Sequence, residues 1–284
     1  MDDAAVLTVG GETLVLTHDM LVEGVHYLPD DPPGDVAWKL VAVNLSDLAA
    51  KGASPFGALF GFTLGDDRWD AAFAEGLGEA LAAFALPLLG GDTVSGPVRT
   101  LGLTAIGKAA GPVPARSGAQ PGDLLWLSGT IGDAGAGLAA LRAGEQRADL
   151  IERYRLPRPR LEAGQRLAPL VSAMMDVSDG LLLDGRRMAA ASGCGLAVEL
   201  DAIPLSEAYL EARGAARIEA ATAGDDYELL FAASPEAASQ VLALAEEIGL
   251  PFSRIGRFEA GAGLTLTEHG APVPLPAKLG FEHG

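Results

Sequence analysis

The chain has one cysteine, Cys194, among 284 residues, so it cannot form an internal disulfide. It also lacks an uninterrupted apolar run of the roughly 20 residues that a membrane-spanning helix needs. It does not open with a charged segment followed by an apolar one, the pattern of a secretory signal. We therefore expect a globular, cytoplasmic protein that has no membrane partner.

Basic residues are scarce. The sequence contains 20 Lys and Arg against 38 Asp and Glu, which gives a formal net charge of −18. A charge of this sign repels the phosphates of nucleic acids and of anionic membranes, so we expect no nucleic-acid partner. An anionic substrate would need metal ions or local arginines in order to bind.

Strand and helix patterns alternate along the chain, and this alternation predicts an α/β (or α+β) fold. The best boundary is Gly111-Pro112-Val113-Pro114, which separates a domain at 1–110 from a domain at 111–284. The expected strands are 13–17, 58–64, 87–89, 100–108, 124–127, 195–200 and 229–231, and the expected helices are 35–51, 70–85, 134–141, 206–213 and 235–248.

Residues 174–184 contain the closest grouping of side chains that could bind a metal ion or a phosphate. Asp176, Ser178 and Asp179 lie between an apolar lead-in and an apolar run that starts after Gly180. Burying two carboxylates is costly without a cation. The glycine indicates a loop that leads into a helix N-terminus, where free N–H groups favour phosphate. Metal-assisted phosphoryl chemistry fits this stretch, and the alternative is that Asp176 or Ser178 only caps the helix.

The helix expected at 35–51 places a carboxylate on its apolar face. Val36, Leu40, Val43 and Asp47 recur at helical spacing, so Asp47 continues an apolar stripe. A charge that points inward needs a partner or a metal ion. The competing interpretation is an exposed aspartate near a frayed helix end.

Other acidic and glycine-rich segments follow strands. Asp19 follows the strand 13–17, and Asp92 follows 87–89 in Gly90-Gly91-Asp92-Thr93, which a plain turn would also explain. Gly24-Val25-His26-Tyr27 is expected to be extended. Residues 128–133 resemble a phosphate-binding turn in outline, but no Gly-Lys-Ser/Thr is present. The arginines of Pro157-Arg158-Pro159-Arg160 either bind phosphate or only solvate a loop.

A set of motifs, in order along nearly the whole chain, resembles thiamine-monophosphate kinase. They are Asp2-Asp3-Ala4-Ala5, Thr17-His18-Asp19, Gly24-Val25-His26, Val43-Asn44-Leu45-Ser46-Asp47-Leu48-Ala49-Ala50, Gly90-Gly91-Asp92-Thr93, Asp176-Val177-Ser178-Asp179-Gly180 and Gly224-Asp225-Asp226-Tyr227-Glu228-Leu229. The resemblance implies two α/β domains, a homodimer formed through the first sheet, and ATP bound near the domain junction. It also implies ATP-dependent, in-line phosphorylation of thiamine monophosphate to thiamine diphosphate.

The resemblance assigns roles to individual positions. It implies magnesium ligands at Asp3, Thr17, Asp19, Asp47, Asp92, Asp176 and Asp179, of which Asp47, Asp92, Asp176 and Asp179 are also expected to be catalytic. It implies nucleotide contacts at Gly91, Asp92, Arg116 and Ser178, and substrate contacts at His26, Asp225 and Phe281. Oxygen ligands without a Cys/His set favour Mg²⁺ over zinc.

The sequence departs from the family pattern at three places. His18 stands where the family has Thr or Ser, Asp225 replaces a glutamate, and Ala223 replaces a glycine. The segment that precedes Asp2 in the family is absent, so we expect a misplaced start or a shortened chain. Two alternatives stay open: another ATP-using enzyme of this fold, of the selenophosphate synthetase or aminoimidazole ribonucleotide synthetase type, and a non-catalytic acidic metal-binding protein.

Overall fold

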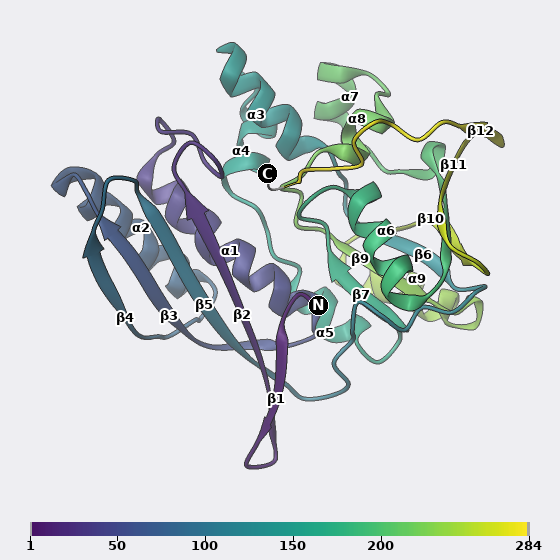
Figure 1. The fold of residues 1–284 in the computed structure, drawn as a ribbon, viewed down its shortest axis with the longest axis horizontal. Coiled ribbons are helices and arrows are strands. Elements are labelled where there is room, and N and C mark those ends of the chain that lie inside the picture. The colour runs from purple at the N-terminus through teal and green to yellow at the C-terminus, as the bar shows by residue number, and fades with distance from the viewer. Residues whose placement is uncertain (1, 283–284) are drawn as a thin grey trace.

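A computed structural model describes residues 2–282, which form two α/β domains, each with its own sheet (Figure 1). The first sheet has the strand order β1-β2-β5-β3-β4. Its strands are β1 (Ala5–Val9), β2 (Glu12–Val22), β3 (Ser54–Leu64), β4 (Leu88–Ser95) and β5 (Thr100–Ala109). It is a mixed sheet, because β3 and β4 are parallel and the other neighbours are antiparallel.

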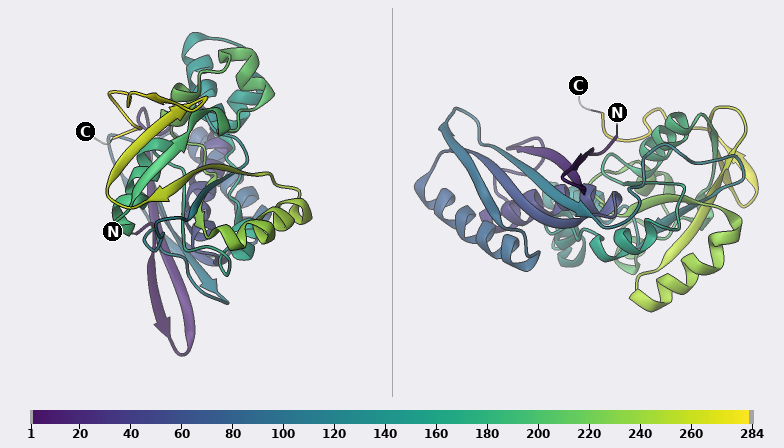
Figure 2. Two further views of the ribbon diagram at one scale, coloured as in Figure 1. Left: turned by 90° about the vertical axis from the view of Figure 1, so that its right-hand side faces the viewer. Right: turned by 90° about the horizontal axis from the view of Figure 1, so that it is seen from below.

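One hairpin projects from the first domain (Figures 1 and 2). It joins β1 to β2, whose facing residues Val9 and Glu12 leave Gly10-Gly11 as a two-residue loop. Both glycines have positive φ, at 60° and 88°, which a tight hairpin turn requires. The sequence patterns did not predict β1, although Gly-Gly between two β-rich runs is the signal for such a turn.

Helices α1 (Pro33–Ala50) and α2 (Asp67–Ala83) accompany this sheet. Pro33 suits the first turn of α1, where its missing N–H costs nothing, and Gly52 follows the end of the helix with a φ of 62°. The helix is buried along nearly its whole length because it packs on β2 and β5 on one side and on the second domain on the other. The helix runs between the two sheets (Figure 1), and Asp47, near its C-terminal end, therefore lies at the junction of the domains.

The second sheet has the strand order β12-β11-β8-β10-β6-β9-β7. Its strands are β6 (Leu124–Ser128), β7 (Ala173–Asp176), β8 (Gly195–Glu199), β9 (Leu229–Ala233), β10 (Phe252–Glu259), β11 (Gly263–Glu268) and β12 (Ala271–Val273). Its helices are α3 (Asp133–Ala143), α4 (Ala148–Arg155), α5 (Leu161–Leu167), α6 (Leu181–Ser192), α7 (Glu207–Arg213), α8 (Arg217–Thr222) and α9 (Ala238–Ile248), with short 3₁₀ turns at Leu200–Ala202 and Pro235–Ala237. Every residue of β9 is buried, because apolar clusters cover both faces of the sheet there.

The predicted helices and the main strands are present, but several boundaries were wrong. β2 continues to Val22, so Asp19 lies inside a strand, and β4 continues through Gly90-Gly91-Asp92-Thr93 because seven of its residues pair with β3. Residues 24–27 form a turn instead of an extended piece. Helices α4 and α8 were not predicted. The boundary between 110 and 111 stays a prediction, with one sheet on each side of it.

The helices of the described residues do not meet the requirements for a membrane span. Among residues 2–282, no helix combines the length and the apolar character needed to cross a bilayer.

Candidate active site

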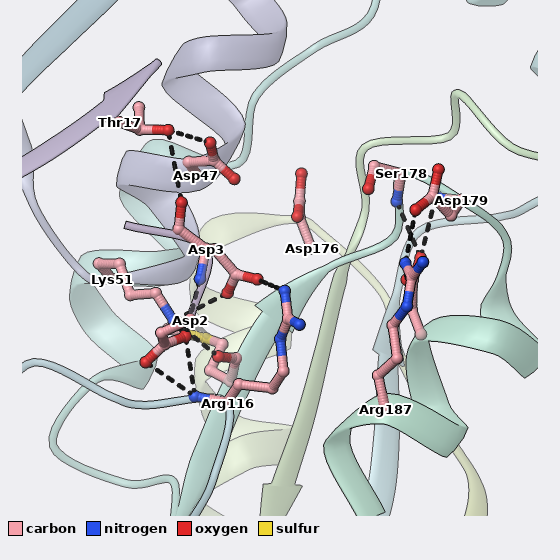
Figure 3. A network of polar contacts seen from close by, with 12 residues as sticks. Asp2, Asp3, Thr17, Asp47, Lys51, Arg116, Asp176, Ser178, Asp179 and Arg187 are labelled. Atoms are coloured by element: carbon pink, nitrogen blue, oxygen red, sulfur yellow. Dashed lines mark hydrogen bonds and ion pairs between the residues drawn. The ribbon is translucent and has the colours of Figure 1, made fainter. Parts of the chain in front are cut away.

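A cleft of about 1080 Å³ opens between the two domains. It is bounded by β2, α1, the loop between β7 and α6, the loop at 222–227 and the C-terminal segment at 278–282. Ten of the predicted site residues line it: Asp3, Asp19, His26, Asp47, Arg116, Asp176, Ser178, Asp179, Asp225 and Phe281. Thr17 lies directly behind the lining, where it donates a hydrogen bond to the carboxylate of Asp47 (Figure 3).

Two buried carboxyl groups, one from each domain, form the floor of the cleft. Asp47 projects from α1 and Asp176 from the end of β7, where Ser46 Oγ donates to Asp176 Oδ2 at 2.6 Å. Burial raises the pKa of Asp47 well above its ordinary value, and the charges of Asp176 and Asp19 raise it further. Burial, followed by the charge of Asp3, raises the pKa of Asp176 to about 8. These groups need a cation if both are to be ionised at neutral pH.

Asp3 already has two cationic partners. Lys51, a fully buried residue just after α1, places Nζ 2.8 Å from Asp3 Oδ2 and 2.6 Å from Asp2 Oδ1. Arg116 Nη2 pairs with Asp3 Oδ1 (Figure 3). A predicted nucleotide contact, Arg116, therefore neutralises a predicted metal ligand in this conformation.

The loop between β7 and α6 is fixed by a carboxylate that the sequence patterns did not single out. Asp184 is buried in the first turn of α6 and accepts hydrogen bonds from the N–H groups of Ser178 and Asp179 at 3.1 and 3.0 Å. Arg187 Nη1 lies 2.5 Å from Asp179 Oδ2 and 2.9 Å from Asp184 Oδ1. Gly180 has a φ of 111°, which lets the chain turn sharply into the helix. In the sequence, Asp184 could have been identified by its position one helical turn after Gly180, where an acid can accept hydrogen bonds from the N–H groups of the preceding loop.

The C-terminal segment and the loop at 222–227 close the other side of the cleft. The N–H of Phe281 donates to the Asp179 carbonyl at 2.8 Å, so this segment packs on the loop between β7 and α6. Asp225 Oδ2 lies 2.7 Å from Nζ of Lys39, a buried lysine on α1 that the sequence analysis did not identify. His26 Nδ1 accepts the N–H of Val22 at 3.0 Å and faces the same cleft.

Two segments for which phosphate binding was one alternative make internal contacts in this conformation. Arg160 pairs through two nitrogens with the fully buried Glu228, which Arg153 also contacts at 3.0 Å. A Cβ at Gly129 would meet the Glu228 carboxylate at 2.4 Å, so this acid occupies the space beside the turn at 128–133. Ala134 and Gly135, just beyond the turn, line the cleft.

Gly91 and Asp92 do not join the cleft within one chain. The sheet registers align Asp92 with Gly61, Gly102 and Met20, and align Gly91 with Phe60, Leu103 and Asp19. Directly opposed residues share a face, so Asp92 points to the face that carries the exposed Met20 and away from α1. Three strand spacings, about 14 Å in all, separate β4 from β2. The predicted convergence of all the acids is thus incomplete in one chain.

The donor chemistry fits Mg²⁺, although the side chains are paired with one another. Among residues 2–282, no group of three or more Asp, Glu, His or Cys side chains is arranged so that it could hold a metal ion. The acids of the cleft offer hard oxygen donors, which Mg²⁺ prefers. In this conformation Asp3 is paired with Lys51 and Arg116, and Asp179 with Arg187. Asp47 and Asp176 instead accept hydrogen bonds from the hydroxyls of Thr17 and Ser46.

Comparison with known proteins gives consistent results over almost the whole chain. Residues 1–109 match the family model for the AIR synthase related protein, N-terminal domain, and residues 120–269 match the model for its C-terminal domain. The chain is 41% identical to a thiamine-monophosphate kinase of Salmonella typhimurium over 99% of this chain and 90% of that protein. It is 40% identical to the thiamine-monophosphate kinase of Escherichia coli K12, with the same coverage.

Solved structures agree with the sequence relatives. The structure described as AaThiL complexed with AMPPCP and TMP superposes with a TM-score of 0.87 at 30% identity, covering 98% of this chain and 90% of that chain. The hydrogenase maturation protein HypE in complex with ATP is 21% identical with a TM-score of 0.80, over 100% of this chain and 89% of that chain, and shows a shared fold only.

Proposed function

We infer that this chain, which belongs to the thiamine-monophosphate kinase family, transfers a phosphoryl group from ATP to thiamine monophosphate and releases thiamine diphosphate and ADP. The observation that carries the proposal is the buried pair Asp47 and Asp176, which come from different domains and meet on the floor of one wide cleft. Joining two polyanions requires positive charge between them and accurate positioning more than covalent chemistry. The cleft offers acids for metal ions, and arginines beside those acids.

We propose that Asp3, Asp19, Asp47, Asp176 and Asp179, with the hydroxyl of Thr17, hold several Mg²⁺ ions that screen the phosphates and stabilise the charge of the transferring group. Asp47, Asp176 and Asp179 are the catalytic members of this set within one chain. Arg116 and Ser178 lie beside these acids and are suited to contact the nucleotide. Arg116 would then exchange Asp3 for a phosphate oxygen, which accepts the same fork of N–H donors.

The acceptor fits the remaining part of the cleft. His26 comes from the turn after β2, Asp225 from the loop before β9, and Phe281 from the C-terminal segment. Phe281 offers an exposed aromatic ring, and Asp225 offers a carboxylate to a cationic ring system. We place these three residues against the thiamine part of the acceptor.

The active form is proposed to be a homodimer that pairs through the first sheet. The face opposite α1 carries exposed apolar side chains at Leu7, Met20, Leu59 and Val94, each between 44% and 53% exposed. A large sheet face of this kind is typical of an interface. Asp92 projects from that face, so it and the neighbouring Gly91 would reach the cleft of the second copy, where Asp92 would act as the fourth catalytic acid and Gly91 would approach the nucleotide.

A mixing experiment tests this shared site. Asp47→Asn and Asp92→Asn chains are each expected to be inactive as homodimers. Co-refolded, they should recover about a quarter of wild-type activity, because half of the dimers are mixed and one of the two sites in each is intact. Absence of recovery in a preparation shown to contain mixed dimers would mean that Asp92 serves its own chain, and an active Asp92→Asn homodimer would mean that Asp92 has no role.

The reaction itself is tested by a phosphoryl-transfer assay on the purified chain with ATP and Mg²⁺. The acceptors are thiamine monophosphate, free thiamine and aminoimidazole precursors, and ADP and the phosphorylated product are both quantified. Equimolar ADP and thiamine diphosphate are expected. Faster turnover of free thiamine, or of an aminoimidazole precursor, rejects the proposal in favour of another enzyme of this fold. Because the reaction consumes ATP, we assign it to the cytoplasm.

A further inference from the structure

Lys39 is a charged residue in a place where charge is costly. It lies on α1 with 2% of its side chain exposed, among the largest fully buried side chains of the described chain. Lysine is almost never buried without partners, since its ammonium group loses its hydration. Its burial therefore calls for an explanation from its contacts.

The contacts of Lys39 come from both domains. Its Nζ lies 2.7 Å from Asp225 Oδ2, donates to the backbone carbonyl of His26 at 3.3 Å, and stands 4.0 Å above the ring centre of Tyr154. His26 belongs to the turn after β2, whereas Asp225 and Tyr154 belong to the second domain. One ammonium group thus joins the two segments that face the acceptor part of the cleft.

Each oxygen of the Asp225 carboxylate accepts a hydrogen bond, so the group is held in one orientation. Lys39 binds Oδ2, and the hydroxyl of Tyr227 donates to Oδ1 at 3.1 Å. Both Asp225 and Tyr227 have positive φ, at 70° and 52°, a backbone conformation that is uncommon for residues other than glycine. Such local strain persists only where surrounding contacts impose it, and it clusters at binding sites. The Asp225 side chain is 31% exposed, so it is still open to the cleft.

We propose that Lys39 is a positioning residue for the acceptor, and that it sets the distance between the His26 turn and the Asp225 loop so that both meet the thiamine part of thiamine monophosphate. This inference rests on the proposed function, and nucleotide binding does not depend on it. The competing explanation is an ion pair that only holds the domains together. The two differ in what is lost on substitution, because a positioning residue changes acceptor affinity, whereas a merely structural one changes stability.

The test compares Lys39→Met with the wild type. Methionine fills a similar volume without charge, and Asp225 is exposed enough to be rehydrated, so the variant should fold. Lys108→Met is the matched control, because Lys108 is 39% exposed and its nearest acid is Glu12, at 3.7 Å, on the first sheet away from the cleft. Measurements are the thermal midpoint, the KM for ATP and for thiamine monophosphate, and calorimetric binding of thiamine monophosphate without ATP.

For Lys39→Met we expect the KM and Kd for thiamine monophosphate to rise about tenfold or more, while the KM for ATP stays within about twofold. Asp225→Asn should weaken acceptor binding similarly. The double variant should bind thiamine monophosphate no more weakly than the single variant with the lower affinity, because both substitutions break the same Lys39–Asp225 contact. The control should match the wild type throughout. A lower melting temperature with unchanged acceptor affinity, or equal losses for both substrates, would overturn the proposal.

The wild-type arm keeps this result separate from the proposed function. If the wild type does not bind or phosphorylate thiamine monophosphate, the proposed function fails. The same comparison is then made with whichever acceptor the panel identifies, and equal affinities of wild type and Lys39→Met for it would overturn the role of Lys39 on its own.

Discussion

The substitution Asp176→Asn is expected to stabilise the metal-free protein, by an amount that increases with pH. Asp176 is buried at the end of β7, and its pKa is raised to about 8 by burial and by the charge of Asp3. In the unfolded chain its pKa is near 4. Between these values the folded protein holds a proton that the unfolded chain releases, so stability falls as pH rises.

The magnitude follows from the same linkage. Each pH unit between the two pKa values costs the folded wild type about 1.4 kcal/mol, so the difference between wild type and Asp176→Asn should grow by about 4 kcal/mol between about pH 5 and about pH 8. Above about pH 8 it should level off. An asparagine oxygen still accepts the hydrogen bond from Ser46, so little is lost at the low end of the range.

The assay is urea unfolding in EDTA at several pH values across this window, with Asp30→Asn as the control because Asp30 is exposed. The control should shift stability by the same small amount at every pH. Adding Mg²⁺ should reverse the ranking of wild type and Asp176→Asn, because only the wild type retains the full set of ligands. If Asp176→Asn stabilises the protein by the same amount at every pH, or destabilises it in EDTA, then Asp176 is not a buried acid that is destabilising until a cation binds.

Further predictions concern the same acids. Asp47→Asn and Asp179→Asn should lower kcat far more than they lower the melting temperature without ligand, because under the proposed mechanism each removes transition-state stabilisation; variants that unfold but keep normal specific activity would identify structural acids. MgCl₂ should raise the wild-type melting temperature more than NaCl of equal ionic strength, by an amount worth about 2.7 kcal/mol at a hundredfold excess over Kd, and ATP should add to it; equal effects of the two salts would indicate simple screening. Arg187→Met should tighten Mg²⁺ binding in nucleotide-free calorimetry by releasing Asp179, whereas Arg186→Met, on the exposed side of α6, should not. Asp184→Ala should lower kcat by about 10- to 100-fold, because the Ser178–Asp179 loop loses the hydrogen bonds that fix it. An unchanged kcat would show that the loop keeps its conformation without Asp184.

The sequence alone determined the features that depend on neighbours along the chain. The apolar stripe of α1 placed Asp47 on the buried side, and the glycine after Asp179 identified the loop that leads into α6, because helical period and turn chemistry are local properties. The ordered motifs also indicated the family, which the relatives confirm. Local patterns were weaker at strand ends, so β2 and β4 ran further than expected, since pairing with neighbouring strands extends them.

The tertiary structure decided which distant groups meet. The side of the sheet to which Asp92 points depends on the register of β4 against β3, and a shift of one residue would reverse it, so no pattern within 87–95 could specify it. The pairing of Asp3 with Arg116, and of Asp225 with Lys39, joins segments that come together only when the two domains pack. The pairing of Asp3 with Lys51 joins segments 48 residues apart that meet only when the first domain folds. The raised pKa of Asp176 likewise arises from burial and from the charge of Asp3, because desolvation and Coulomb energy depend on distance in space and not on separation along the chain.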